Sequence, residues 1–108
     1  MYSTYERADT VLAELMLDLN GCRIARIHQQ AVTTVAVELG DAGDGPLRLI
    51  GEVEGPITRM LALNELPPWH DGRVIAWADL VGERVIVALE SGNQFFLRAQ
   101  SLRIERGV

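Results

Sequence analysis

The sequence predicts an α+β fold in which one N-terminal amphipathic helix packs on an antiparallel β-meander of about five or six strands. Two patterns lead to this prediction. Near the N-terminus, apolar residues recur at three- and four-residue spacing, which is the period of one helix face. Farther along, branched residues alternate with others in short runs bounded by Gly, Asn and Pro, as is typical of strands joined by turns. We therefore expect residues 1–108 to form a single compact α+β domain.

The predicted helix covers about residues 4–19. Ser3 followed by Glu6 matches the capping box of a helix start, and Asn20-Gly21 suits the left-handed conformation that ends many helices. The apolar stripe between these signals consists of Ala8, Val11, Leu12, Leu15, Met16 and Leu19. Such a stripe has to be covered, either by the sheet or by a second copy of the chain.

Residues 22–54 contain the next strands. Residues 22–39 are rich in branched side chains and predict one or two strands, with a break near residues 28–30. Residues 41–46 are small, acidic and rich in structure breakers, which indicates a loop. Residues 47–54 alternate again and predict another strand.

The segment of residues 56–66 allows two interpretations. Pro56 suits the first position of a short helix that Pro67 and Pro68 would end. Alternatively, residues 54–56 form a turn and residues 57–63 pair back onto the preceding strand. Met, Leu and Ala favour the helix whereas Ile and Thr favour the strand, so propensity does not separate them. We favour a short helix or an irregular crossover.

Residues 72–104 carry the strongest strand signals of the meander. Residues 91–93 tolerate the backbone conformations of a tight hairpin turn, residues 95–99 form the return strand, and a further strand contains Leu102 and Ile104. Apolar side chains occupy both parities here: Val85, Val87 and Leu89 on one, Ile86, Ala88 and Phe96 on the other. The sheet is therefore expected either to curl into a small barrel or to be covered by a second subunit.

Composition and charge narrow the class of partner. Apolar residues make up 48% of the chain and charged residues 23%, as expected of a folded domain. The formal net charge of −5 disfavours binding to nucleic acid and to anionic lipid. All 10 positive residues are arginine, which indicates a GC-rich bacterial genome or a mobile element such as a phage. A protein partner fits this surface better than a polyanion does.

The sequence contains no motif for catalysis, metal binding or cofactor binding. It has no glycine-rich nucleotide fingerprint, and the lack of lysine excludes a phosphate-binding loop of the usual kind. Cys22 and two distant histidines do not supply a metal site, and a single cysteine fits a reducing cytosol. No signal peptide and no apolar run of membrane-spanning length is present. We expect a cytoplasmic protein that is not an enzyme, holds no cofactor and does not contact a membrane.

The candidate site is a cluster around the two tryptophans. Trp69, His70, Asp71 and Trp77 lie within nine positions, and Arg98 comes from a neighbouring predicted strand. Exposed aromatic and arginine side chains are enriched where proteins bind ligands or partners. Packing is the competing interpretation, because Trp77 sits mid-strand, Trp69 follows two prolines and His70-Asp71 suits a turn. We give packing the greater weight.

The function predicted from these patterns is a small non-enzymatic binding module that associates with itself, most simply as a dimer. A sharper form of the hypothesis is an adaptor or inhibitor encoded by a phage or another bacterial mobile element. The alternative is a small-molecule-binding domain with a pocket at the mouth of the curled sheet. That pocket would use Trp69, His70, Trp77 and Arg98.

Overall fold

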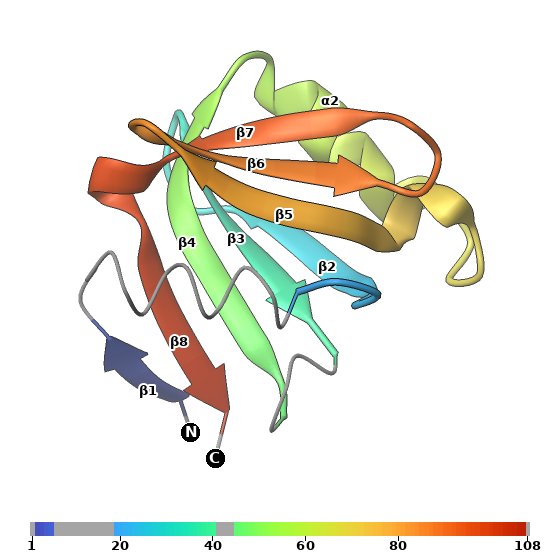
Figure 1. Ribbon diagram of the computed structural model, residues 1–108, viewed down its shortest axis with the longest axis horizontal. Coiled ribbons are helices and arrows are strands. Elements are labelled where there is room, and N and C mark those ends of the chain that lie inside the picture. The colour runs from blue at the N-terminus through green and yellow to red at the C-terminus, as the bar shows by residue number, and fades with distance from the viewer. Residues whose placement is uncertain (1, 6–18, 41–44, 108) are drawn as a thin grey trace.

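The fold is described by a computed structural model that places residues 2–5, 19–40 and 45–107 (Figure 1). This part of the chain is mostly antiparallel β-sheet, with one short α-helix and three 3-10 helices, and is broadly α+β. The elements in order are β1 (Tyr2–Tyr5), β2 (Ile24–Gln29), β3 (Thr34–Leu39), β4 (Leu47–Glu54), α2 (Ile57–Leu61), η1 (Ala62–Glu65), η2 (Asp71–Arg73), β5 (Ile75–Val81), β6 (Arg84–Leu89), β7 (Gln94–Arg98), η3 (Ala99–Ser101) and β8 (Arg103–Gly107).

The predicted N-terminal helix lies almost entirely outside the described residues, so it stays a prediction. Its expected start is wrong, because Thr4 and Tyr5 belong to β1, where they pair with Glu105 and Ile104 of β8. β-Branched and aromatic residues favour such an extended conformation. At the other end of the predicted helix, Leu19 is fully buried in a turn.

Strand β4 is the centre of the sheet. One of its edges pairs with β3 from Leu47 to Glu52, while its other edge pairs first with β8 and then, at Val53 and Glu54, with β7. Two strands can share one edge because η3 forms a corner between them, where the Ser101 hydroxyl accepts a hydrogen bond of 3.0 Å from the Glu52 N–H. Gly51 allows this corner to approach closely, since a Cβ there would lie 3.3 Å from Leu102 Cδ1. The last strand therefore leaves the β5–β7 meander and pairs with β4 and β1.

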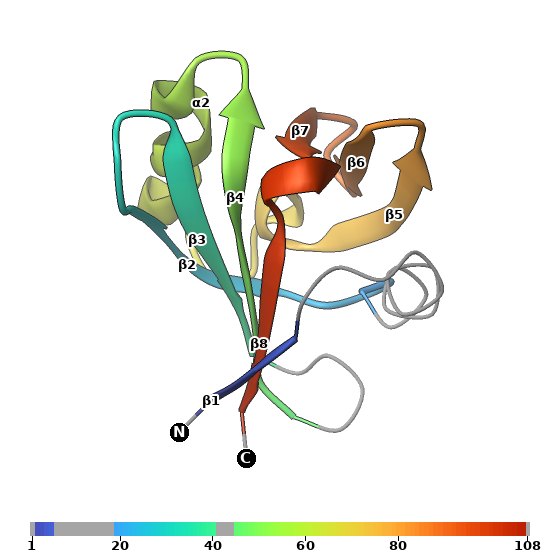
Figure 2. The ribbon, with the colours of Figure 1, turned by 90° about the vertical axis from the view of Figure 1, so that its left-hand side faces the viewer.

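The core lies between two parts of this bent sheet. Figure 2 shows β2, β3, β4 and β8 on one side and β5, β6 and β7 on the other. Val85 and Val87 are fully buried and Leu89 is nearly so, which confirms their predicted common face. The largest fully buried side chains are Leu19, Ile24, Ile27, Val35, Val37, Leu39, Leu47, Leu49, Ile75, Val85 and Leu97.

The crossover between the two parts is helical. Of the two interpretations of residues 56–66, the short helix is confirmed, as α2 followed directly by η1, and the strand is wrong. Pro56 precedes the first helical residue in an extended conformation, and Met60 anchors the helix in the core. Among the described residues, no helix has the length and apolar character needed to cross a membrane.

The sheet does not close into a barrel, which corrects one of the two expected arrangements. Closure would require β2 to pair with β5, and within the described residues a single isolated bridge, Arg23 to Val74, joins these regions. Two backbone hydrogen bonds support it, from the Gly21 N–H to the Ile75 carbonyl (2.7 Å) and from the Ile75 N–H to the Cys22 carbonyl (2.8 Å). Beyond this bridge β2 and β5 are not paired, and residues of the crossover contact the free edge of β2 instead.

Side chains of the crossover take the place of a paired strand along β2. The Asn64 side chain accepts a hydrogen bond from the Ile27 N–H and donates one to the Ile27 carbonyl, each of 2.8 Å. Arg73 donates to the carbonyls of Ile24 (3.1 Å) and Ala25 of the same edge, and to that of Leu66 (2.7 Å). Unpaired backbone N–H and carbonyl groups are costly when they are buried. These side chains therefore explain how the sheet stays open although no strand pairs with this edge of β2.

Candidate functional site

The predicted cluster at Trp69 lies in the turn before η2. Trp69 is 76% exposed, and both His70 and Asp71 are exposed. The His70 Nδ1 atom accepts a hydrogen bond of 2.9 Å from the Gly72 N–H and so caps η2. Gly72 is tightly packed, since a Cβ there would lie 2.6 Å from Leu66 Cδ1. His70 therefore has a structural task in leading the chain into β5, and Asp71 is the first residue of η2.

The other two predicted residues, Trp77 and Arg98, lie on one face of the sheet but apart from each other. Trp77 pairs with Ala88, and Arg98 pairs with Arg84 at the other end of β6. Their positions differ by four residues along the strands and by two strand spacings across the sheet. With the usual strand dimensions, their backbones are therefore roughly 16 Å apart. The two side chains therefore do not line one cavity.

The face that carries Trp77 is unusually apolar for the outside of a sheet. We call Trp77, Val81, Ile86, Ala88 and Phe96 the outer apolar face; they lie on the side of β5–β7 turned away from the core. Trp77 is 43% and Val81 51% exposed, Ile86 and Phe96 are half-buried, and Ala88 is buried. Exposed Asp79 lies on the same face, between Trp77 and Val81 on the edge strand β5 and opposite Ile86. Apolar side chains gathered on one outer face in this way are more typical of a contact surface than single scattered ones.

Charged side chains of both signs surround this face. The Arg84 guanidinium lies 5.5 Å from the centre of the Phe96 ring, and its Nε atom is 3.1 Å from Glu54 Oε2. Arg98 Nε is 3.9 Å from the other oxygen of the same carboxylate. Together with exposed Asp79 on the edge strand β5, the charged groups on and around this face are two acidic and two basic, so their formal charges cancel.

The open edge of β5 is protected against addition of another strand. The two-residue turn at Gly82-Glu83 makes Val81 and Arg84 a hydrogen-bonded pair, so by alternation the Leu80 N–H points to the open edge. The Asp79 Oδ1 atom accepts a hydrogen bond of 2.8 Å from this N–H. A charged side chain on an edge strand discourages strand pairing. The face of the β5–β7 sheet is therefore a better contact surface than its edge.

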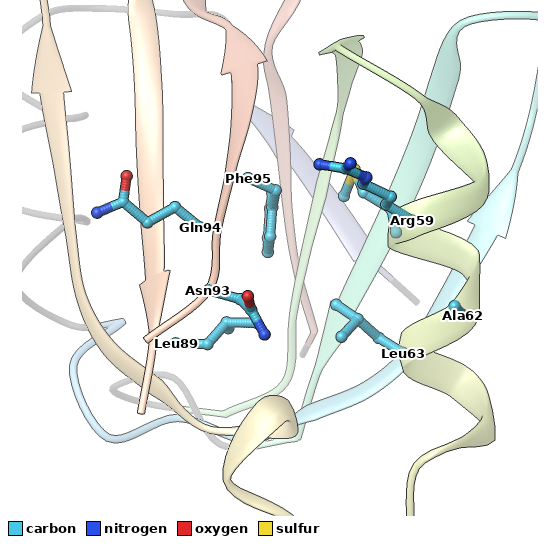
Figure 3. A pocket seen from close by; sticks show the side chains of 8 residues that line it. Arg59, Ala62, Leu63, Leu89, Asn93, Gln94 and Phe95 are labelled. Atoms are coloured by element: carbon cyan, nitrogen blue, oxygen red, sulfur yellow. The ribbon is translucent and has the colours of Figure 1, made fainter. Parts of the chain in front are cut away.

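A pocket of about 480 Å³ lies between the crossover and the start of β7 (Figure 3). Its floor is apolar, with Met60, Leu89 and Phe95 buried and Leu63 partly buried. The lining residues are Arg59, Met60, Ala62, Leu63, Leu89, Asn93, Gln94 and Phe95. Volume and lining are in the range of small-ligand sites.

A network of charged groups crosses the other part of the sheet. His28 Nε2 lies 2.7 Å from Glu38 Oε2, Arg48 reaches Glu38 Oε1 at 3.0 Å, and Arg48 also reaches Glu105 Oε1 at 3.1 Å. Burial by itself would raise the pKa of Glu38, but the hydrogen bonds from His28 and Arg48 outweigh it, so this pKa is lowered. These groups link β2, β3, β4 and β8 and stabilise the sheet.

The described residues contain no group of three or more His, Cys, Asp or Glu side chains that would hold a metal ion. None of the predicted site residues lines the pocket. The sequence predicts a short helix or crossover at residues 56–66 and a turn at residues 91–93, and it does not single out Arg59, Asn93 or Gln94 as site residues. The available signal was an arginine within the mainly apolar run of residues 57–63, together with polar residues at the end of a predicted turn.

Comparison of the chain with protein-family models, with curated proteins and with solved structures gives no match.

Proposed function

We propose that this chain is a small non-enzymatic binding module that associates with a second copy of itself through the outer apolar face. The observation that carries the proposal is the exposure of Trp77 and Val81 beside half-buried Ile86 and Phe96. Water contact with this surface is unfavourable by roughly 25 cal/mol per Å² of apolar area, so covering it provides a driving force for association. Tryptophan is also among the residues that contribute most to protein interfaces.

The charges around the face favour a second copy over an unrelated partner. Two copies with a net charge of −5 each repel at long range, but the border charges of this face cancel. In a two-fold dimer both copies use the same surface, so a contact between residue i of one copy and residue j of the other occurs twice. Arg84 and Arg98 of each copy can therefore approach Glu54 and Asp79 of the other copy. A host protein bound by an adaptor or inhibitor of phage or mobile-element origin is the alternative partner.

Sedimentation velocity of the purified chain tests the proposal, at concentrations from about 5 to 200 µM to cover micromolar affinities. We expect a dimer that Trp77→Ser dissociates and that Trp69→Ser leaves unchanged. Trp69 is the matched control, because it is an exposed tryptophan outside the outer apolar face. Val81→Ser provides a milder second variant, and circular dichroism shows whether each variant is folded. A wild-type chain that stays monomeric, or equal effects of the two tryptophan substitutions, would show the proposal to be wrong.

Binding of a small molecule is the second candidate function. Its predicted residues, Trp69, His70, Trp77 and Arg98, do not enclose a common space, as described above. The pocket beside α2 supports it instead, because that pocket combines an apolar floor with a cation and amide groups at its border.

A further inference from the structure

We propose that the pocket between the crossover and β7 binds the C-terminal end of an extended polypeptide. In this arrangement the last side chain of the peptide is apolar and lies on the pocket floor, its carboxylate pairs with Arg59, and its main chain runs along β7 at Gln94. Three features of the pocket support this ligand class, and among the described residues no acidic one lines it.

The first feature is a cation that has no counter-ion among the described residues. Arg59 lies on the exposed side of α2, and its side chain forms no hydrogen bond or ion pair with the described residues. Most other described arginines are engaged, for example Arg48, Arg73 and Arg84. A free guanidinium beside an apolar floor is complementary to a carboxylate attached to an apolar group, because it offers paired N–H donors to the two oxygens.

The second feature is an open strand edge inside the pocket. The ladder between β4 and β7 ends at the Glu54–Phe96 pair, where β4 turns away into α2. The turn before β7 is closed by a hydrogen bond of 2.8 Å from the Leu89 N–H to the Asn93 carbonyl. Because backbone groups alternate along a strand, the N–H and carbonyl of Gln94 point to the same side of β7 as those of Phe96. Phe96 pairs with β4 on that side, whereas no described strand pairs with Gln94 there. These groups are free to pair with an added extended segment.

The third feature is the position of the side chains around this edge. Figure 3 shows the Gln94 side chain pointing away from α2, which leaves its backbone on the pocket side. Phe95 and Leu63 point into the space between β7 and the helix, with Asn93 at one end and Arg59 at the other. An apolar side chain fits between Phe95 and Leu63 while a main chain lies along Gln94. A small carboxylate would use Arg59 and the floor but would leave the edge unpaired.

Peptide pools test this inference without knowledge of the natural partner. The probe is a pool of hexapeptides with random leading positions and Val, Leu, Ile or Phe last, added at about 1 mM total to detect affinities in that range. Nuclear magnetic resonance then follows the backbone amides of Gln94 and Phe95 and the Nε–H of Arg59. We expect shifts with the free-acid pool and much weaker shifts with the same pool as C-terminal amides.

Two substitutions assign the shifts to the proposed contacts. Arg59→Gln should weaken binding at least about tenfold, because a charge-assisted hydrogen bond is lost. Arg103→Gln is the matched control, since Arg103 is an exposed arginine of β8 that has no side-chain interaction with the described residues. Gln94→Pro removes the outward N–H at the first position of a strand, where proline is tolerated, and should weaken binding roughly fivefold.

Several results would overturn the inference. These are no shifts with the free-acid pool, equal shifts with the acid and amide pools, or unchanged binding in Arg59→Gln. Octanoate that binds as tightly as the acid pool would instead identify a site for small carboxylates. The test is independent of self-association, because the pocket floor and Arg59 are not part of the outer apolar face. It can be performed in the Trp77→Ser variant, so failure of one proposal is distinguishable from failure of the other.

Discussion

Substitution of Asn64 by alanine tests the explanation of why the sheet stays open. The Asn64 amide satisfies both backbone groups of Ile27, a residue that is 2% exposed, through two hydrogen bonds of 2.8 Å. Each lost bond costs about 0.5–1.5 kcal/mol, and more where water cannot replace it. Asn64 itself is exposed, so water reaches part of the site, while alanine gains a few tenths of a kcal/mol in helix propensity. We therefore expect a net loss of about 2 kcal/mol in unfolding free energy.

Equilibrium urea denaturation measures this loss, and amide hydrogen exchange of Ile27 localises it. Glu65→Ala is the matched control, because Glu65 is exposed in the same 3-10 helix and makes no side-chain hydrogen bond with the described residues. Asn64→Asp is a sharper variant, because it places a carboxylate oxygen against the Ile27 carbonyl. Its loss of unfolding free energy relative to wild type should therefore become smaller as acid protonates the carboxyl group. A change below about 0.5 kcal/mol for Asn64→Ala, within the usual range of surface substitutions, would refute the role given to this side chain.

Two further predictions concern groups that sequence reasoning did not single out. The pKa of Glu38 is lowered from its ordinary value of 4.5, so its contribution to stability is present above that value and is lost as pH falls through the folded-state pKa. In urea denaturation the stability difference between wild type and Glu38→Gln should therefore shrink below about pH 4.5; a difference independent of pH would contradict this. Arg73→Lys should lower the melting temperature by roughly 5–10 °C, because an ammonium group cannot reach the carbonyls that the guanidinium joins. Arg26→Lys, on exposed β2 surface, is its control in the same calorimetric experiment and should change little.

Local patterns in the sequence predicted the strands better than their partners. The strand at residues 47–54 and the inward parity of Val85, Val87 and Leu89 follow from alternation and turn residues. The break expected near residues 28–30 lies at residues 30–33 instead, because His28 and Gln29 still belong to β2. Alternation does not determine which strands pair, so the departure of β8 from the meander was not foreseen. Apolar residues on both parities were consistent with a barrel, but they equally describe an open sheet with an exposed apolar face.

The contacts that decide between those two forms join residues far apart in the chain. Asn64 and Ile27 are 37 positions apart, and Arg73 and Ile24 are 49 positions apart. Neither pair has a local signature, because a side chain that caps a distant strand edge resembles any exposed polar residue in sequence. The pocket could not be predicted for the same reason, since Arg59 and Phe95 come together only in the tertiary fold.

The treatment of the strand edges also bears on where this protein meets its partners. Side chains of the crossover cover the edge of β2, and Asp79 caps the outward N–H of Leu80 on β5. Both devices act against strand addition at the places where an open sheet is most exposed to it. At Gln94 the strand edge has no such cover among the described residues, and it lies beside a free arginine and an apolar floor. Because this edge combines unpaired strand groups with a cation and an apolar floor, it is the place where we expect a bound strand.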